Sequence, residues 1–281
     1  MKALHLKLPH SIWKALQERQ SVSGEPLHHI VRTALANYLR VEHATLFQVS
    51  TSTALVEGIY EGAVSVGELR KHGNFGLGTF EGLDGEMVAL DGHFYQVKSD
   101  GSVREATDPE LSPFAVVTFF EAEQTIEIDD CPDLKALFGQ LDKLRASENV
   151  FYAIRVDGRF DTMHTRAMCK SEEGTPLVVA AAHQPEFRIS DIEGTVVAIW
   201  SPEYVKALEI PGYHLHFVTK DRSAGGHVLA LSGKRLKAGI QLLTELHMAL
   251  PENPDFLRAD LTRDSSSALE RVENAKEGSK P

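Results

Sequence analysis

The feature that most restricts the fold of this chain is a series of short apolar runs separated by Asp-Gly pairs at residues 84–85, 91–92 and 100–101. Asp-Gly suits the tight turns that join antiparallel strands, because both positions accept a positive φ angle. Further strand-like runs follow toward the C-terminus, separated by other turn-forming residues. The pattern therefore predicts a body built mainly from antiparallel or mixed β-sheet.

The later part of the chain contains both expected strands and one expected helix. Apolar residues at helical spacing predict a helix over residues 134–146. The last strand-like run alternates apolar and polar side chains, which favours a strand and leaves a helix as the alternative. The expected strands cover residues 114–120, 150–156, 177–182, 195–200, 213–218, 227–231 and 240–250. We expect an α+β body over residues 44–264 in two subdomains, followed by a polar, loose tail over residues 265–281.

The first 43 residues have a different pattern. Apolar residues alternate over residues 3–8, which predicts a strand, and two helices are expected, over residues 11–19 and from Pro26 to about residue 39. This strand-helix-helix order resembles the ribbon-helix-helix module, in which two chains pair their strands and interlock their helices. The resemblance implies at least a homodimer, with Ala3, His5 and Lys7 on the face that meets DNA. DNA binding and dimerisation alone remain the two alternatives for this head.

Charge confines any contact with nucleic acid to the head. The whole chain has a net charge of −11, whereas six basic and three acidic side chains give residues 1–43 a charge of +3. The remaining residues therefore carry −14 and repel a phosphate backbone.

The sequence predicts neither a membrane anchor nor a disulfide framework. The longest wholly apolar run, residues 177–182, is far shorter than the ~20 residues of a spanning helix, and the N-terminus has no apolar signal-peptide region. Cys131 and Cys169 are too few for a disulfide scaffold or a four-thiolate metal site. We therefore expect a cytoplasmic protein that makes no contact with membranes.

Three histidines near residue 220 are the strongest candidates for metal ligands. His214 and His216 share one face of a strand because they are two residues apart. A Gly-rich turn then brings His227 onto the neighbouring strand. Three imidazoles suit zinc and leave a coordination position for a substrate, although nickel, copper, cobalt and iron also accept such ligands. Glu209, His247 or a carboxylate of the tail are candidates for a fourth ligand, and histidines that simply line a sheet are the alternative.

Several segments together resemble the α-acetolactate decarboxylase family. They are residues 73–80 (GNFGLGTF), 83–86 (LDGE), 165–166 (TR), 211–217 (PGYHLHF) and 221–227 (DRSAGGH), in a stretch of similarity from about residue 46 to 275. Gly76 and Gly78 are expected to form turns, since no helix follows them as a dinucleotide-binding loop requires. The head lies outside the family pattern.

The resemblance implies a reaction and a set of residues for it. It implies decarboxylation of (S)-2-acetolactate to (R)-acetoin through a metal-stabilised enediolate, with Zn²⁺ held by the three histidines. It also implies a pocket lined by Glu86, Arg166 and a carboxylate of the tail, for which we choose Glu273, with Glu270 as the alternative.

General chemistry suggests a task for each of these groups. Arg166 would orient the substrate carboxylate, and Glu86 or Glu273 would supply the proton that completes acetoin. The competing interpretations are a ribbon-helix-helix regulator that senses a metal or acetolactate, and a family member without activity that still binds acetolactate.

Overall fold

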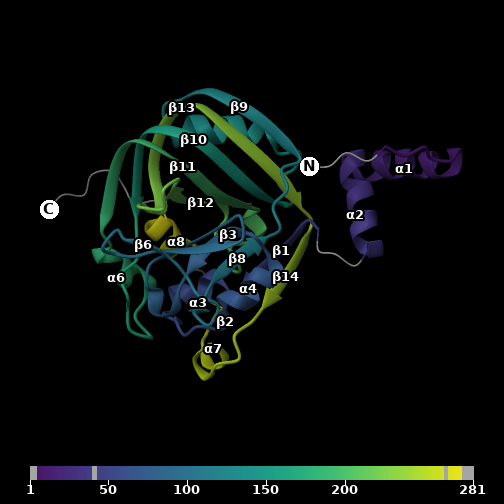
Figure 1. Cartoon of the computed structure of the whole chain (residues 1–281). Helices are drawn as coiled ribbons and strands as arrows, with labels where there is room; N and C mark the ends of the chain where they lie inside the picture. Colours follow the sequence, from purple (N-terminus) through teal and green to yellow (C-terminus); the bar gives the residue numbers. More distant parts are fainter. Residues whose placement is uncertain (1–4, 40–42, 263–264, 274–281) are drawn as a thin grey trace.

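The computed structural model describes residues 5–39, 43–262 and 265–273, with the backbone alone at residues 266, 270 and 273. Two helices, α1 (His10–Ser23) and α2 (Leu27–Leu39), project from one side of a body made of two packed sheets (Figure 1). The ribbon-helix-helix strand expected over residues 3–8 is not formed at residues 5–8, and Ala3 lies outside the described residues. Such a strand is paired by a second chain, so the ribbon-helix-helix assignment stays a prediction.

The first sheet has seven strands in the order β14-β1-β8-β3-β4-β5-β6. All neighbours are antiparallel except β1 and β14. The turn at Asp91 and Gly92, both with positive φ, joins β4 to β5 as the Asp-Gly pair predicts. The strands are β1 (Thr45–Val49), β3 (Phe75–Thr79), β4 (Glu86–Leu90), β5 (His93–Val97), β6 (Val103–Glu105), β8 (Ala115–Thr118) and β14 (Glu245–Ala249), and a separate pair is formed by β2 (Val64–Ser65) and β7 (Leu111–Ser112).

The second sheet is built from long antiparallel strands. It comprises β9 (Gln124–Cys131), β10 (Phe151–Arg166), β11 (Glu186–Ser201), β12 (Gly212–Thr219) and β13 (Gly225–Leu243). β10 pairs with β11 and with β13, while β12 pairs with both β11 and β13. These four strands therefore close into a ring of pairings, and β9 adds to the free side of β13.

Short helices complete the body, and several of them pack into its main core. They are α3 (Ser52–Val56), α4 (Val66–His72), α5 (Leu134–Leu141), α6 (Leu177–Ala180), α7 (Pro254–Arg258) and α8 (Ser266–Glu273), with 3₁₀ turns η1 (Glu81–Leu83), η2 (Asp142–Leu144), η3 (Ala181–His183) and η4 (Glu203–Val205). The largest buried cluster combines Leu77 and Val88 of the first sheet with Val197 and Val218 of the second. The main core therefore lies between the sheets, where apolar burial contributes most.

The expected fold class is confirmed, because mixed and antiparallel sheets form the body and helices precede it. The expected helix over residues 134–146 begins at Leu134 and ends at Leu141, where η2 follows. The domain boundaries at residues 43 and 264 stay predictions.

Two other expectations were wrong, and a third was right only in part. Residues 177–182 form α6 and η3 instead of a strand, since Pro176 precedes them and Leu177 and Ala180 pack into the main core as a helical pair. The preference for a strand over a helix at residues 240–250 is confirmed, but the run is divided at Thr244 between β13 and β14, which belong to different sheets. The described part of the tail, expected to be loose, forms α8, because Leu269 and Val272 are buried one helical turn apart.

Gly76 and Gly78 lie inside β3, so the expectation that they form turns was wrong. A Cβ atom on Gly76 would lie 2.0 Å from the carbonyl oxygen of Val116, and one on Gly78 would lie 2.4 Å from that of Phe114. These glycines permit the close approach of β3 to β8. Among the described residues, no helix has both the length and the apolar character needed to cross a membrane.

The substitution Gly76→Ala should lower the free energy of unfolding by about 3 kcal/mol, because the added methyl group overlaps the backbone of β8. Urea denaturation measures this loss. Gly139→Ala is the matched control: Gly139 lies in α5 with no atom within 4 Å of an added Cβ, so the control should be neutral or stabilising by up to ~1 kcal/mol. Equal effects of the two substitutions would contradict the close approach.

Candidate active site

The strand β12 presents two imidazoles on the same face. Gly212, with φ of 80°, starts the strand, and the alternation that follows turns His214 and His216 inward. Both side chains are buried. The sequence therefore predicted correctly that these two residues are neighbours on a strand.

A tight turn then brings a third imidazole to the same place. The Thr219 hydroxyl accepts hydrogen bonds from the backbone N–H groups of Ser223 and Ala224, which fixes the reversal from β12 to β13. A Cβ atom on Gly226 would lie 2.4 Å from the carbonyl oxygen of Arg166, so only glycine lets β13 approach β10 so closely here. The register that results pairs His216 with His227 across the two strands.

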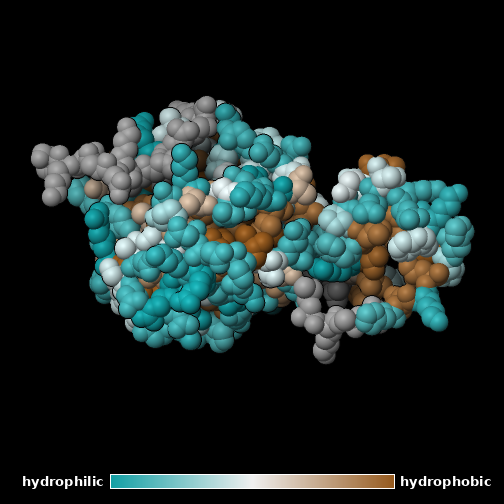
Figure 2. Space-filling view, turned by 90° about the horizontal axis from the view of Figure 1, so that it is seen from above, coloured by the Kyte–Doolittle hydropathy of each residue, from teal (hydrophilic) through white to brown (hydrophobic). Residues whose placement is uncertain are grey.

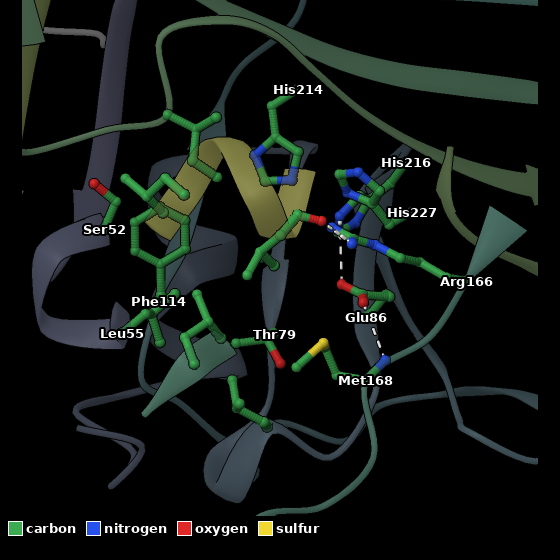
Figure 3. A pocket seen from close by; sticks show the side chains of 16 residues that line it. Ser52, Leu55, Thr79, Glu86, Phe114, Arg166, Met168, His214, His216 and His227 are labelled. Atoms are coloured by element: carbon green, nitrogen blue, oxygen red, sulfur yellow. Dashed lines mark hydrogen bonds and ion pairs between the residues drawn. The ribbon is translucent and has the colours of Figure 1, made fainter. Parts of the chain in front are cut away.

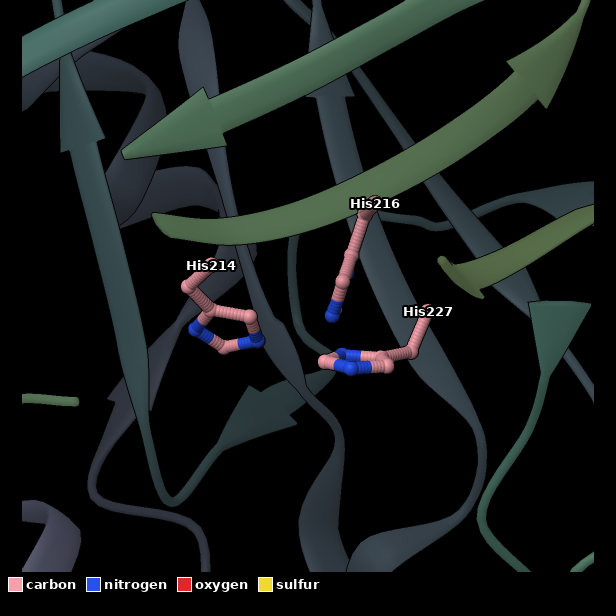
Figure 4. A group of neighbouring side chains, drawn as sticks. All are labelled: His214, His216 and His227. Atoms are coloured by element: carbon pink, nitrogen blue, oxygen red, sulfur yellow. The ribbon is translucent and has the colours of Figure 1, made fainter. Parts of the chain in front are cut away.

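The three imidazoles converge on one point (Figure 4). One ring nitrogen from each of His214, His216 and His227 lies within 4.8 Å of the others, and the ring centroids are 5.0 to 5.4 Å apart. A zinc ion with bonds of about 2.0–2.1 Å holds its ligand atoms roughly 3.3 Å apart, so a small inward movement of the rings would complete three bonds. The donor set and its spacing fit a metal ion with an open coordination position.

The surroundings keep two of these rings neutral. Burial, together with the positive charge of Arg166, lowers the pKa of His214 to about 3. Burial and the neighbouring His214 lower the pKa of His216 well below its usual value. Nδ1 of His216 donates a hydrogen bond of 2.7 Å to the carbonyl oxygen of Met87, so the electron pair of that ring is on Nε2. Neutral imidazoles in a fixed tautomer are what metal binding requires.

Two of the candidates for a fourth ligand, Glu209 and His247, lie outside the imidazole group, and the side chains of Glu270 and Glu273 in the tail are not among the described residues. His247 is exposed on β14, in the other sheet, and Glu209 uses Oε1 to accept a hydrogen bond from the N–H of Ile210. Neither belongs to the group formed by the three histidines. Among the described residues, the carboxylate next to the imidazoles is that of Glu86.

Glu86 begins β4 and is buried in the same pocket. Its Oε2 lies 3.4 Å from Nε2 of His216, and its Oε1 accepts a hydrogen bond of 3.1 Å from the N–H of Met168 (Figure 3). One carboxylate oxygen is thereby anchored, and the other faces the imidazole group.

Arg166 ends β10 directly opposite His227 and is 2% exposed. Its Nη1 donates a hydrogen bond to the carbonyl oxygen of Val272 in α8. The arginine therefore connects the C-terminal helix to the pocket. Glu270 and Glu273 belong to the same helix, but their side chains lie outside the described residues, so the choice between them stays a prediction.

The rest of the pocket wall is mostly apolar. The cavity between these side chains is small, with a volume of about 50 Å³. The sequence gives no sign that these residues line a pocket, because nothing in their local pattern distinguishes them from ordinary core residues. Those that enclose the imidazole group include Leu55, Leu83, Phe114, Met168, Ile210 and Leu269.

Comparison with known proteins gives one consistent family. The model of the family described as "Alpha-acetolactate decarboxylase" matches residues 46–263. Relatives with that name from Methanosarcina mazei and Methylococcus capsulatus are 43% and 42% identical, over 81% and 83% of this chain and 80% and 90% of their own lengths. The crystal structure of alpha-acetolactate decarboxylase from Bacillus subtilis is similar with a TM-score of 0.80 at 35% identity, covering 82% of this chain and 99% of that one.

The depressed pKa of His214 predicts how the metal-free protein responds to acid. Between pH 6.5 and about 3 the unfolded chain binds a proton at this histidine and the folded chain does not, so acidification favours unfolding. The contribution is ~1.4 kcal/mol per pH unit, or about 2 kcal/mol between pH 6.5 and 5. Urea denaturation at these two pH values should show a smaller loss of stability in His214→Gln than in the unsubstituted protein. The same loss in both would contradict the buried, neutral state of His214.

Proposed function

We propose that this chain, which belongs to the alpha-acetolactate decarboxylase family, converts (S)-2-acetolactate to (R)-acetoin and CO₂ with the aid of zinc. Membership of the family makes it a decarboxylase, a lyase. The observation that carries the finer proposal is the meeting of three buried imidazoles with Glu86 and Arg166 in one small pocket.

The substrate supplies its own electron sink. Acetolactate is a β-keto acid with a hydroxyl group on the carbon that bears the carboxylate. When the bond to CO₂ breaks, its electron pair forms a carbon–carbon double bond and the neighbouring ketone oxygen becomes negative. The carbon that carried the carboxylate later takes a proton, which gives acetoin. An organic cofactor that accepts electrons is therefore unnecessary.

His214, His216 and His227 would hold the zinc ion. Bound there, zinc supplies a Lewis acid that stabilises negative charge on the substrate's oxygens. The protein's part is to keep the three rings neutral and oriented: burial keeps His214 and His216 unprotonated, and the carbonyl of Met87 fixes the tautomer of His216. Nickel, copper, cobalt and iron fit the same donors, and zinc is our choice among them.

Arg166 would bind the carboxylate that leaves. A guanidinium group has five N–H donors in one plane, and the hydrogen bond to Val272 uses one of them. The side chain is fixed by this bond and by burial, so it can orient the carboxylate relative to the ketone. Because CO₂ is neutral, a very tight grip on the anion would slow its departure, and we assign Arg166 to orientation.

Glu86 would deliver the proton. Its Oε1 is anchored by the N–H of Met168, while Oε2 faces the imidazoles from one side of the pocket. Delivery from one side gives a single enantiomer of acetoin. Glu273, the other candidate from the sequence, remains a prediction because its side chain lies outside the described residues.

The apolar walls would assist the loss of CO₂. Leu55 and Phe114 line the pocket with side chains that cannot solvate a carboxylate. In such surroundings the carboxylate has lost its hydration and interacts with Arg166 instead. Neutral CO₂ needs no such solvation, so its formation is favoured there.

We also propose that the N-terminal helices pair with those of a second copy. Apolar side chains gather on this part of the molecule (Figure 2), and Leu6, Trp13 and Tyr38 are 60%, 43% and 84% exposed. Pairing two heads as in a ribbon-helix-helix dimer would cover such a surface. DNA binding by the head stays a prediction of the sequence.

The substitution His216→Ala should abolish zinc binding at the centre and lower kcat by at least about 100-fold, because charge on the substrate oxygens is no longer stabilised. Glu86→Gln should lower kcat by a similar factor, through loss of the proton donor, while zinc content is kept. The measurement is acetoin formation from racemic 2-acetolactate above the spontaneous rate, with metal analysis of each protein.

His247→Ala is the matched control, since this exposed histidine lies in the other sheet and should leave turnover unchanged. Turnover that survives in His216→Ala would disprove the proposed centre. No turnover in the unsubstituted, zinc-loaded protein would instead favour the regulator or the inactive relative that binds acetolactate.

Deleting residues 1–43 should leave kcat within about twofold of the full chain, because every residue of the described pocket lies beyond residue 50. The family match also begins only at residue 46. Turnover assays on both forms measure this, and circular dichroism checks that the shortened chain is folded. Loss of activity in a folded truncated chain would show that the head contributes to the site.

Light scattering of the full chain tests the proposed pairing of the heads. A monomeric full chain would contradict it.

A further inference from the structure

A second cluster of metal-ligating side chains lies where the head meets the body. His29 comes from α2, His43 from the segment before β1, and Glu123 from the residue before β9. One ligand atom from each of these three residues lies within 4.8 Å of the others, as in the imidazole group of the main pocket. None of the three residues lines that pocket.

The cluster joins α2 directly to the body. Nδ1 of His29 lies 3.2 Å from Oε1 of Glu123, and Nη1 of Arg32 lies 3.5 Å from the same oxygen. Nε2 of His28 is 3.9 Å from Oε2. The side chains of His29 and Glu123 are 1% and 5% exposed, so this imidazole–carboxylate pair is closed to solvent.

Two buried nitrogens at this contact lack partners. Nε2 of His29 and Nε2 of His43 make no hydrogen bond to any described residue, although both atoms are inaccessible to solvent. Burying a polar atom without a partner is unfavourable, and each such atom requires a physical explanation. A bound cation would provide one, because the electron pair of a neutral imidazole would then be used.

The donor types favour a cation of the zinc class. Two imidazoles and one carboxylate form a common set of three protein ligands, with a fourth position left for water. Arg32 opposes a cation through its charge, but its side chain is 26% exposed and can turn toward solvent. His28 is more exposed still, at 43%. Neither residue needs to remain beside Glu123 when an ion binds.

We propose that His29, His43 and Glu123 form a second divalent-cation site, of the zinc type, that fastens the N-terminal head to the catalytic body. Two of its ligands precede residue 46, where the family match begins, so the site depends on the added head. The proposal is independent of the reaction assigned to the main pocket.

Metal stoichiometry tests the second site directly. The full-length protein is stripped with a chelator, loaded with excess Zn²⁺, freed of unbound metal and analysed by mass spectrometry. We expect two zinc ions per chain in the unsubstituted protein, one in His43→Gln, one in His216→Ala and none in the double variant. His28→Gln, which changes the exposed neighbour, should retain two. Turnover of His43→Gln should equal that of the unsubstituted protein.

The outcomes separate the two sites. If His43→Gln and the unsubstituted protein bind the same amount of zinc, the second site is wrong. If zinc is lost in His43→Gln but not in His216→Ala, the second site holds and the main centre is wrong. Glu123→Gln, which keeps the shape of the side chain, repeats the test should His43→Gln fail to fold.

A structural measurement adds a readout of attachment. In the His216→Ala variant, Zn²⁺ should slow the hydrogen exchange of the backbone amides of α2. In the double variant His216→Ala, His43→Gln, Zn²⁺ should leave the exchange of α2 unchanged. Equal exchange in both proteins would show that a cation at this contact does not fasten the head.

Discussion

The hydrogen bond from Nδ1 of His216 to the carbonyl oxygen of Met87 connects the two sheets inside the pocket, and the geometry of the candidate centre depends on it. It fixes one imidazole relative to β4, the strand that also carries Glu86. The register of β12 and β13 places His227 opposite His216, and the register of β13 and β10 places Arg166 opposite His227. Four groups from both sheets are thus placed by one hydrogen bond and two strand registers, and strands position a site more precisely than loops do.

Burial determines the chemistry of these groups. In water an imidazole would carry a proton for part of the time near neutral pH, but burial and the charge of Arg166 keep His214 neutral. The same exclusion of water strengthens the interaction of Arg166 with a carboxylate and makes the neutral product CO₂ favourable.

The N-terminal head differs from the pocket in its surface and in its contacts. Apolar side chains are exposed on it, and its contact with the body gathers His29 and His43 around the buried carboxylate of Glu123.

The sequence predicted well what depends on local pattern. Alternation placed His214 and His216 on one face, and the Gly-rich turn predicted the return of the chain to His227, because period and turn chemistry act over a few residues. It failed where distant contacts decide. Residues 177–182 look like a strand but form a helix, since their neighbours are α8 and the main core and not an adjacent strand. The alternating run over residues 240–250 is divided at Thr244, because the residues before and after it pair with strands of different sheets. Gly76 looked like a turn residue, and only the position of Val116 explains it. The places of Glu86 and Arg166 came from the family resemblance and could not have come from their spacing.

The central claim is that His214, His216 and His227 jointly hold one metal ion beside Glu86. Anomalous diffraction from crystals of the zinc-loaded protein, recorded on both sides of the zinc absorption edge, tests it most directly. The account predicts a peak within bonding distance, about 2.0–2.1 Å, of one nitrogen from each of the three rings. A fully loaded crystal with no peak among these rings, or with zinc bound to fewer than three of them, would contradict it.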